Sequence, residues 1–453
     1  MTDDFSLKNP WLWGNMVICA VIAYRCYRAR DPIYFWSPAL FIAAIYFYYV
    51  IVGPWVTFEF GSGIDRGIDM RGYCGPAWLG SLIGLVAWLT GYGMRALVRR
   101  RERPMQFRPP LPLQQLWWLA LGLNIVGLAC FAIVAGADFF RLLNPFVRAD
   151  EPTGAGYTGI FFNYFALAVN FLIPGCAIIL LVRLKGHGRW LVVLAWILVA
   201  SGIFVTLGFR YRLVLLGSGI AFAYYLHRRA RPNFIAALLV ATIFVTVMGE
   251  IGATRRYGLG LDLRQRNASW TESLLGGFGE AAIFATSGAV LEHVPSERGY
   301  VGWEPFKQTL LLPIPAQLLP GKNTNEYLIE TLVMIYGEQA YIGAAYMFFA
   351  EAYLAFGWPG LVVAHLVLGW LCHWLWRWYL GRQHDPLALL VYASAVPYIY
   401  VIFSRGYLPQ TVMLFFFSVA PAIVLYWWPR QPRLVSPVRP RATLALVAEP
   451  DEP

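Results

Sequence analysis

Charged residues are scarce in this chain of 453 residues. Asp, Glu, Lys and Arg together make up 13% of it, whereas they make up about 25% of a soluble globular protein. Hydrophobic residues reach 58% and aromatic residues 17%. This composition excludes a soluble enzyme and is typical of a membrane protein whose helices face lipid.

Paired cysteines and metal-binding motifs are missing as well. The 6 cysteines stand singly, mostly within apolar runs, and no CxxC pair occurs. HExxH, HxxxH and DxD-like pairs are absent, as are a Walker loop, GxSxG, and GxGxxG after a strand. We therefore expect no disulfide, no metal site and no other cofactor.

Long apolar runs, in contrast, recur from end to end. Each is close to the ~20 residues that cross a bilayer, and about eleven spans are predicted. The expected fold is an all-α, polytopic membrane helical bundle with a long outward, periplasmic loop that carries short helices lying on or dipping into the membrane interface. The predicted spans are 11–24, 33–53, 75–94, 113–136, 157–182, 190–207, 213–226, 233–250, 358–376, 386–403 and 409–428.

The charge pattern predicts the orientation of these spans. The net charge of +11 is concentrated in every second loop, and such basic loops lie in the cytoplasm. This places the amino terminus outside and the carboxyl terminus inside, and it gives no reason to expect nucleic acid as a partner. The chain then divides into spans one to eight (1–250), the long outward loop (251–357), spans nine to eleven (358–428) and a disordered cytoplasmic tail (429–453).

Several arginines break the inside bias and point to an anion. Arg210 and Arg212 stand in the outward turn GFRYR, Arg255 and Arg256 in ATRRYG, and Arg405 in SRGYLPQ. A cation at the membrane centre costs ~2.5–3.5 kcal/mol, and the planar guanidinium matches phosphate oxygens in pairs. Any single one is explained equally well by snorkelling to the headgroups or by pairing with an acid. As a group they predict a site for a lipid-borne anion such as a polyprenyl diphosphate.

Outward carboxylates supply candidates for a general base. Glu280, Glu338 and Glu351 lie beside small or aromatic residues, and His293 is the outward histidine. A base must come within ~3 Å of the hydroxyl group that it activates. Most outward acids of such a protein are solvated or salt-bridged, but Glu280 and Glu351 stand inside apolar segments.

Aromatic residues are the third feature of the outward side. Most of them fit the interfacial belts of membrane proteins. Trp303, Tyr336 and Tyr353, near the outward acids and arginines, are also candidates for stacking on sugar rings.

The outward loop resembles that of the Wzy-type O-antigen and exopolysaccharide polymerases of bacterial inner membranes. The resemblance covers 251–361 and rests on GGFGE, then RGYVGWEPFKQTLLLPIPAQLLPGK, then FFAEAYLAFGWPGLV, with GFRYR where the family tends to place an arginine. One departure is Ala316 and Gln317, where an arginine is often found; the odd span count is another.

The resemblance implies a multi-pass inner-membrane glycosyltransferase, independent of metal. Such an enzyme passes the growing chain from undecaprenyl diphosphate to a new lipid-linked repeat unit. Arg210, Arg212, Arg255 and Arg405 would bind the diphosphate, and Glu280 or Glu351 would serve as base. Membrane lipid, a chain-length-regulating co-polymerase and a flippase would be its partners.

Two alternatives stay open, namely an O-antigen ligase, which transfers the polymer to lipid A core, and a transporter or flippase of lipid-linked glycans. An acyltransferase, suggested by His365 alone, is the weakest of the alternatives.

Overall fold

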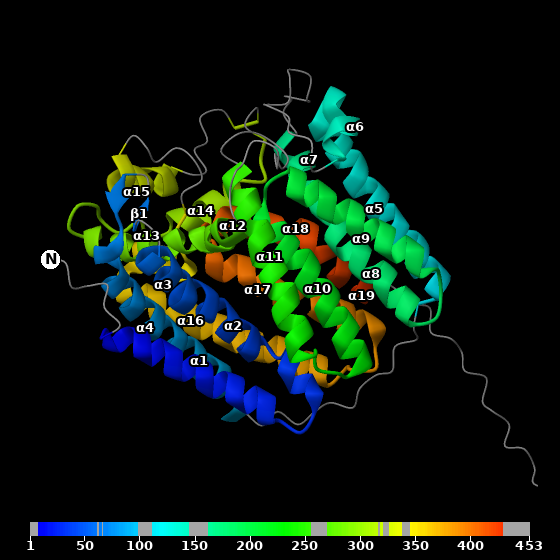
Figure 1. Cartoon of the computed structure of the whole chain (residues 1–453), viewed down its shortest axis with the longest axis horizontal. Helices are drawn as coiled ribbons and strands as arrows, with labels where there is room; N and C mark the ends of the chain where they lie inside the picture. The colour runs from blue at the N-terminus through cyan, green and yellow to red at the C-terminus, as the bar shows by residue number, and fades with distance from the viewer. Residues whose placement is uncertain are drawn as a thin grey trace, which may run out of the picture.

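The chain folds into a bundle of helices, as the sequence predicts (Figure 1). The computed structural model describes residues 8–60, 63–65, 67–97, 111–144, 162–254, 270–315, 318–319, 326–337 and 345–428. Within these ranges the strands are limited to one antiparallel hairpin, β1 (Ile64–Asp65) with β2 (Ile68–Asp69), in which Ile64 pairs with Asp69.

The helices are as follows. The first half contains α1 (Pro10–Arg28), η1 (Pro32–Trp36), α2 (Pro38–Tyr46), η2 (Phe47–Val52), α3 (Gly53–Trp55), η3 (Val56–Phe60), η4 (Arg71–Tyr73), α4 (Cys74–Leu97), α5 (Leu113–Ala135), η5 (Gly136–Asp138), α6 (Phe139–Leu142), α7 (Phe162–Ala168), η6 (Val169–Phe171), α8 (Leu172–Leu184), α9 (Trp190–Thr206) and α10 (Arg210–Arg228). The second half contains α11 (Phe234–Thr254), α12 (Trp270–Gly277), η7 (Phe278–Ala281), α13 (Ala282–His293), α14 (Glu304–Leu311), α15 (Glu326–Tyr336), α16 (Phe348–Leu380), α17 (Pro386–Ser404), α18 (Leu408–Ser418) and α19 (Ala420–Trp427).

Local sequence sets where many of these helices begin. Proline is the first residue of α1, η1, α2 and α17, where its missing N–H costs nothing. The residue before each proline is Asn9, Asp31, Ser37 or Asp385, whose side chain accepts a hydrogen bond from the first turn. These caps satisfy backbone donors that the helix itself leaves unpaired.

Membrane-spanning length is reached by eight helical segments within the described residues, or by nine if the bent pair α18 and α19 is one span. Several match the prediction closely: 75–94, 113–136, 233–250 and 386–403 correspond to segments within α4, α5, α11 and α17. The all-α polytopic bundle is therefore confirmed.

The predicted and observed spans differ at defined places. The helices α1, α9 and α10 are present but are too short or too polar to be counted as spans; α10, for example, has arginines at both ends. Conversely, the predicted outward loop 251–357 contains the segment Thr271–His293, which is long and apolar enough to cross a membrane. The same loop ends earlier than predicted, because α16 begins at Phe348 rather than at 358.

A break inside α16 explains that last difference. Phe356 and Gly357 leave helical geometry, and Gly357 has φ +67°, which favours glycine. The predicted start at 358 is the start of the longer segment after this break. The earlier part, Phe348–Ala355, is a separate short helical stretch that carries Glu351.

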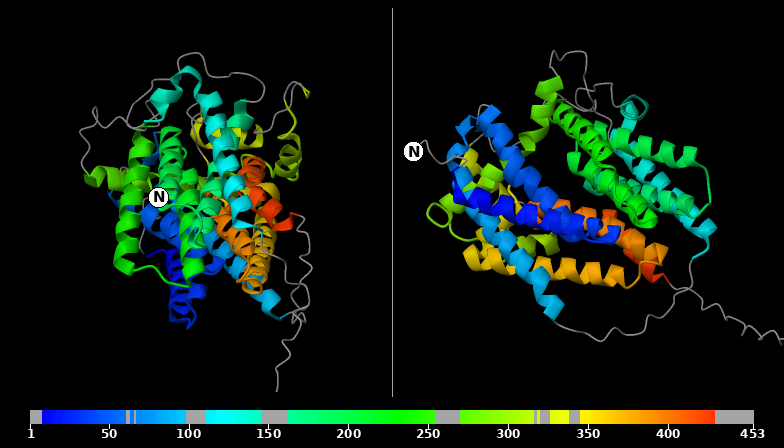
Figure 2. Two further views of the ribbon diagram at one scale, coloured as in Figure 1. Left: turned by 90° about the vertical axis from the view of Figure 1, so that its right-hand side faces the viewer. Right: turned by 60° about the horizontal axis from the view of Figure 1, so that its bottom comes forward.

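The helix α17 joins two groups of helices (Figures 1 and 2). One group contains α1, α2, α4 and α16, and the other contains α5, α8, α9 and α10; α17 packs on α2 and α16 of the first group and on α8 and α10 of the second. In its most apolar stretch 89% of residues are buried, against 22% in that of α11. Thus α17 is the central helix, and α11 is peripheral.

Two glycines allow α4 and α16 to approach closely. A Cβ atom added to Gly91 would lie 2.0 Å from the carbonyl oxygen of Leu366, and one added to Gly369 would lie 2.1 Å from that of Trp88. Close contact of backbones through small residues is a common way for helices to associate in lipid.

The two ends of the bundle differ in charge. At the basic end, Arg229 donates to Gln383 over 2.9 Å, Arg231 donates to the carbonyl of Ala29, and arginines close α1 and α10. The opposite end carries the β1–β2 hairpin, α14, α15 and the start of α18. We call the end with these arginines the basic end. We call the opposite end the cavity end, because a cavity lies there.

Candidate functional site

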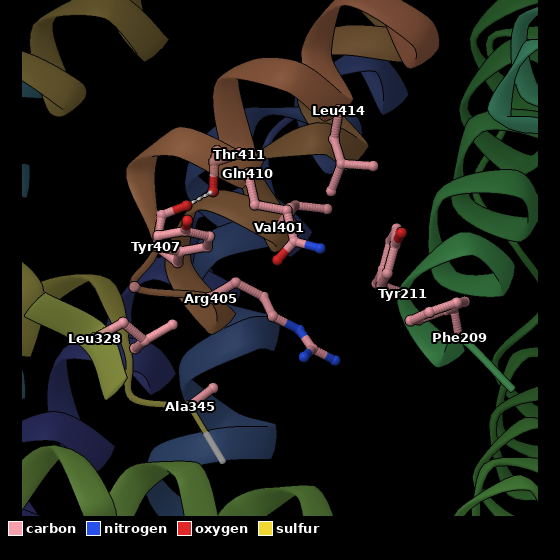
Figure 3. A pocket seen from close by; sticks show the side chains of 11 residues that line it. Phe209, Tyr211, Leu328, Ala345, Val401, Arg405, Tyr407, Gln410, Thr411 and Leu414 are labelled. Carbon is pink, nitrogen blue, oxygen red and sulfur yellow. Dashed lines mark hydrogen bonds between the residues drawn. The ribbon is translucent and has the colours of Figure 1, made fainter. Parts of the chain in front are cut away.

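A cavity of about 170 Å³ lies at the cavity end, between the start of α10 and the junction of α17 with α18 (Figure 3). Polar side chains gather on the α17–α18 side, and aromatic rings of α10 face them. The lining residues are Phe209, Tyr211, Leu328, Ala345, Val401, Arg405, Gly406, Tyr407, Gln410, Thr411 and Leu414. Because it combines cationic, polar and apolar groups, this cavity suits the head of an amphiphilic anion.

The guanidinium of Arg405 is the positive charge on the cavity wall. It extends from the end of α17 toward α10, and its Cζ lies 5.7 Å from the ring centroid of Tyr211 (Figure 3). Gln410 and Thr411, one turn into α18, line the same space. The sequence predicted an anion-binding role for Arg405, and the structure places this residue in a cavity of suitable character.

Backbone hydrogen bonds fix the loop that carries Arg405. The N–H of Gly406 donates to the carbonyl of Tyr346 over 2.6 Å. A Cβ atom at Gly406 would lie 2.7 Å from the carbonyl oxygen of Met347, so a larger residue would push the loop away from this strand of chain. The loop is therefore held against 346–347 before any ligand binds.

Glu351 supports the same loop from behind. Its Oε1 accepts a hydrogen bond from the N–H of Leu408 at 2.8 Å and another from the hydroxyl of Tyr327 at 2.6 Å. Leu408 is the first residue of α18, so the carboxylate caps that helix. Glu351 is 5% exposed and does not line the cavity. Predicted as a base, it is placed in the structure where it orients the Arg405 loop.

The phenol of Tyr327 is suited to this contact. Burial, and next the nearby carboxylate of Glu351, raise the pKa of Tyr327 well above its ordinary value. Its hydroxyl therefore stays protonated at physiological pH and donates to the carboxylate.

The two arginines of GFRYR lie in different environments. Arg212 is 2% exposed; its Nη2 donates to the carbonyl of Ala166 over 2.8 Å, and its Cζ lies 4.8 Å from the ring centroid of Phe209. Its Nη1 has no hydrogen-bond partner among the described residues. Arg210 instead extends toward α11, where a Cβ atom at Gly252 would lie 1.3 Å from its Nη2. Neither lines the cavity, but Tyr211 between them does.

His293 belongs to a separate group at the end of α13. Its Nε2 lies 3.1 Å from the hydroxyl of Tyr73, and its Nδ1 lies 2.7 Å from Oε1 of Glu297. It does not line the cavity. The histidine connects the loop before α4 to the turn after α13.

The predicted sugar-stacking residues are not gathered in one place. Tyr336 is buried, and its hydroxyl meets Thr286 at 2.6 Å and Asp65 at 2.9 Å. Tyr353 is buried too, and donates to the carbonyl of Val294 at 3.0 Å. Burial leaves neither ring a free face for a sugar, whereas Trp303 is 71% exposed.

The remaining predicted residues are only partly described. Glu280 lies in η7, and its side chain is outside the described part of the structure. Glu338, Arg255 and Arg256 lie outside the described residues altogether. Among the residues that the structure does describe, no three His, Cys, Asp or Glu side chains are grouped as a metal site would require.

Sequence reasoning missed Tyr211, Gln410 and Thr411. Each stands one to six residues from an arginine that it singled out. Their proximity to these arginines in the chain could have indicated them. The sequence does not show, however, that the start of α10 lies opposite α17 and α18.

Comparisons with known proteins leave the family open. No family model matches the chain, and no curated protein or solved structure is significantly similar to it.

Proposed function

We propose that this protein is a glycosyltransferase of the bacterial inner membrane that polymerises oligosaccharide repeat units carried on undecaprenyl diphosphate. The observation that carries the proposal is the position of Arg405, whose guanidinium faces a cavity at the end of the bundle opposite the basic loops. By the positive-inside rule, that end is the periplasmic one. A lipid-linked diphosphate would reach the cavity from the outer leaflet.

In this reaction a hydroxyl group of the acceptor unit attacks the anomeric carbon of the donor sugar. The bond from that carbon to the diphosphate oxygen breaks, and undecaprenyl diphosphate leaves with the electron pair. Arg405 would pair with the diphosphate oxygens and stabilise the charge that develops there, while the side-chain amide of Gln410 would donate a further hydrogen bond.

The proton of the attacking hydroxyl needs an acceptor. Since Oε1 of Glu351 already accepts two hydrogen bonds, we assign Glu351 to positioning of the Arg405 loop. The sequence favours Glu280 and Glu351 as candidate bases, so Glu280 is the one that we assign to this role. A co-polymerase that sets chain length and a flippase that supplies lipid-linked units would act with the protein.

The test is deletion of the gene in its native host, followed by complementation with the wild type, Arg405→Ala or Arg382→Ala. Arg382 is the matched control, because it lies at the basic end and donates to the carbonyl of Trp378. We expect single undecaprenyl-linked repeat units in the deletion strain and with Arg405→Ala, and long chains with the other two. Long chains that accumulate on the carrier would instead indicate a ligase. An unchanged glycan profile would exclude both enzymes and favour a transporter.

A further inference from the structure

An exposed apolar surface lies on α14, away from the cavity. Trp303 is 71% exposed, Phe306 46% and Leu310 77%, and their spacing of three and four residues puts them on one face of the helix. The opposite face is buried through Pro305 and Gln308. Bulky apolar side chains that are this exposed and this close together mark a binding surface.

This surface is built onto the break in α16. The N–H groups of Val301 and Gly302 donate to the carbonyls of Leu354 (3.0 Å) and Ala355 (2.9 Å), just before the break. The broken helix leaves carbonyls without helical partners, and in lipid these must be satisfied by other parts of the protein. The turn at 301–302 does this and places Trp303, at the start of α14, beside the break in α16, while α14 itself packs on α18.

Trp303 connects the apolar face of α14 to α16. The rings of Trp303 and Phe356 meet edge to face, with centroids 5.1 Å apart. From there an exposed apolar stripe follows α16 at helical spacing through Val363, Val367 and Trp370. Because α16 is long and apolar enough to span a membrane, this stripe faces hydrocarbon. The face of α14 is the outer continuation of a lipid-facing surface.

The charges beside this face fit a membrane interface. Lys307 is exposed and pairs with Glu304 at 3.3 Å on the flank of the helix. A lysine at that position can extend its amine to lipid phosphates while its methylene groups cover apolar surface. The three residues of the face offer a single polar atom, the indole N–H of Trp303, whereas a sugar site needs several hydrogen-bonding groups.

We propose that the outer leaflet of the bilayer covers Trp303, Phe306 and Leu310, so that α14 lies in the membrane interface as an anchor. Trp303 then contacts lipid rather than sugar. The inference does not depend on the reaction proposed above, because it concerns only where the membrane surface lies.

Spin labels would test this placement. Leu310→Cys would be labelled in a Cys26→Ser background, since Cys26 is the cysteine that is not fully buried among the described residues. Val367→Cys is the control for hydrocarbon and Ser296→Cys the control for water. The full-length protein would be reconstituted in vesicles of phosphatidylethanolamine and phosphatidylglycerol, and collisions with oxygen and with a water-soluble nickel chelate would be measured.

We expect an oxygen-to-nickel collision ratio at position 310 several-fold above that at 296 and close to that at 367. A ratio equal to that at 296 would overturn the proposal, and it would leave the face open to a glycan. If Leu310→Cys does not fold, Phe306→Cys on the same face gives the same test.

Discussion

Arginine is used differently at the two ends of the bundle. At the basic end, the exposed Arg229 donates to the side-chain oxygen of Gln383, and the half-buried Arg382 donates to the carbonyl of Trp378. At the cavity end, Arg212 is buried among aromatic rings and Arg405 faces a cavity. The positive-inside rule alone explains the arginines of the basic end. A buried cation needs compensation, which Arg212 receives from the carbonyl of Ala166 and from nearby aromatic rings, whereas Arg405 presents its guanidinium to a cavity that an anion can enter.

The largest difference between the two ends is expected for substitutions of Arg405. Arg405→Lys keeps the charge but loses the planar fork, and charge-assisted hydrogen bonds of ~1.5–3 kcal/mol correspond to a tenfold to hundredfold loss. We expect polymer formation in the complemented strain to fall by at least about tenfold, since this is the lower end of that range. Arg229→Lys at the basic end should leave it unchanged. Full-length polymer at wild-type levels from Arg405→Lys would show that no bidentate contact is made.

The buried Arg212 should separate activity from stability. Arg212→Met removes the cost of burying a charge but leaves the carbonyl of Ala166 without its donor, so the two effects oppose each other and the free energy of unfolding should change by no more than about 1–3 kcal/mol. We expect polymer formation to fall, because Nε of Arg212 donates to the hydroxyl of Tyr211, which lines the cavity. Thermal unfolding and polymer analysis on the same samples would measure both. A large loss of stability would mean that Arg212 mainly holds α10 against Ala166.

Glu351 allows a comparison of two substitutions at one position. Glu351→Gln keeps an oxygen that can accept from Tyr327 and Leu408, whereas Glu351→Ala removes it and leaves the N–H of Leu408 without its cap. We expect the glutamine variant to retain most polymer formation and the alanine variant to lose it, with a loss of stability of about 1 kcal/mol from the cap. Inactivity of a well-folded Glu351→Gln protein would instead identify Glu351 as the general base.

Tyr327→Phe should have the smallest effect. It removes one hydrogen bond to Glu351, worth about 0.5–1.5 kcal/mol, and keeps the bond from Leu408. Polymer length should be unchanged, and the midpoint of thermal unfolding should fall slightly. A complete loss of polymer would show that the phenol itself takes part in the reaction.

The sequence was most informative where a single segment decides the structure. Apolar length predicts α5, α11 and α17 closely, and the charge pattern singles out Arg405. The predicted start of a span at 358 coincides with the break at Phe356 and Gly357.

The sequence was least informative where the hydrogen-bond partners of a residue come from distant segments of the chain. Glu351 meets Tyr327 and Leu408, which are 24 and 57 residues away in the chain. The sequence predicts a sugar-binding role for Tyr336 because outward acids stand near it, but this residue lies on the buried face of α15. Local composition does not determine which way a ring points.

The close contact of Gly91 and Gly369 with the facing backbones bears on how the protein can move. Two helices in such contact have no side-chain layer that could slide, so α4 and α16 shift as one rigid body. The short stretch of α16 that carries Glu351 also lies against α4, where a Cβ atom at Gly80 would lie 3.1 Å from the ring of Phe349, and Glu351 ties the Arg405 loop to it. The aromatic wall of the cavity comes from α10, in the other group of helices. A rotation between the two groups would therefore change the width of the cavity without disturbing the loop that carries its charge.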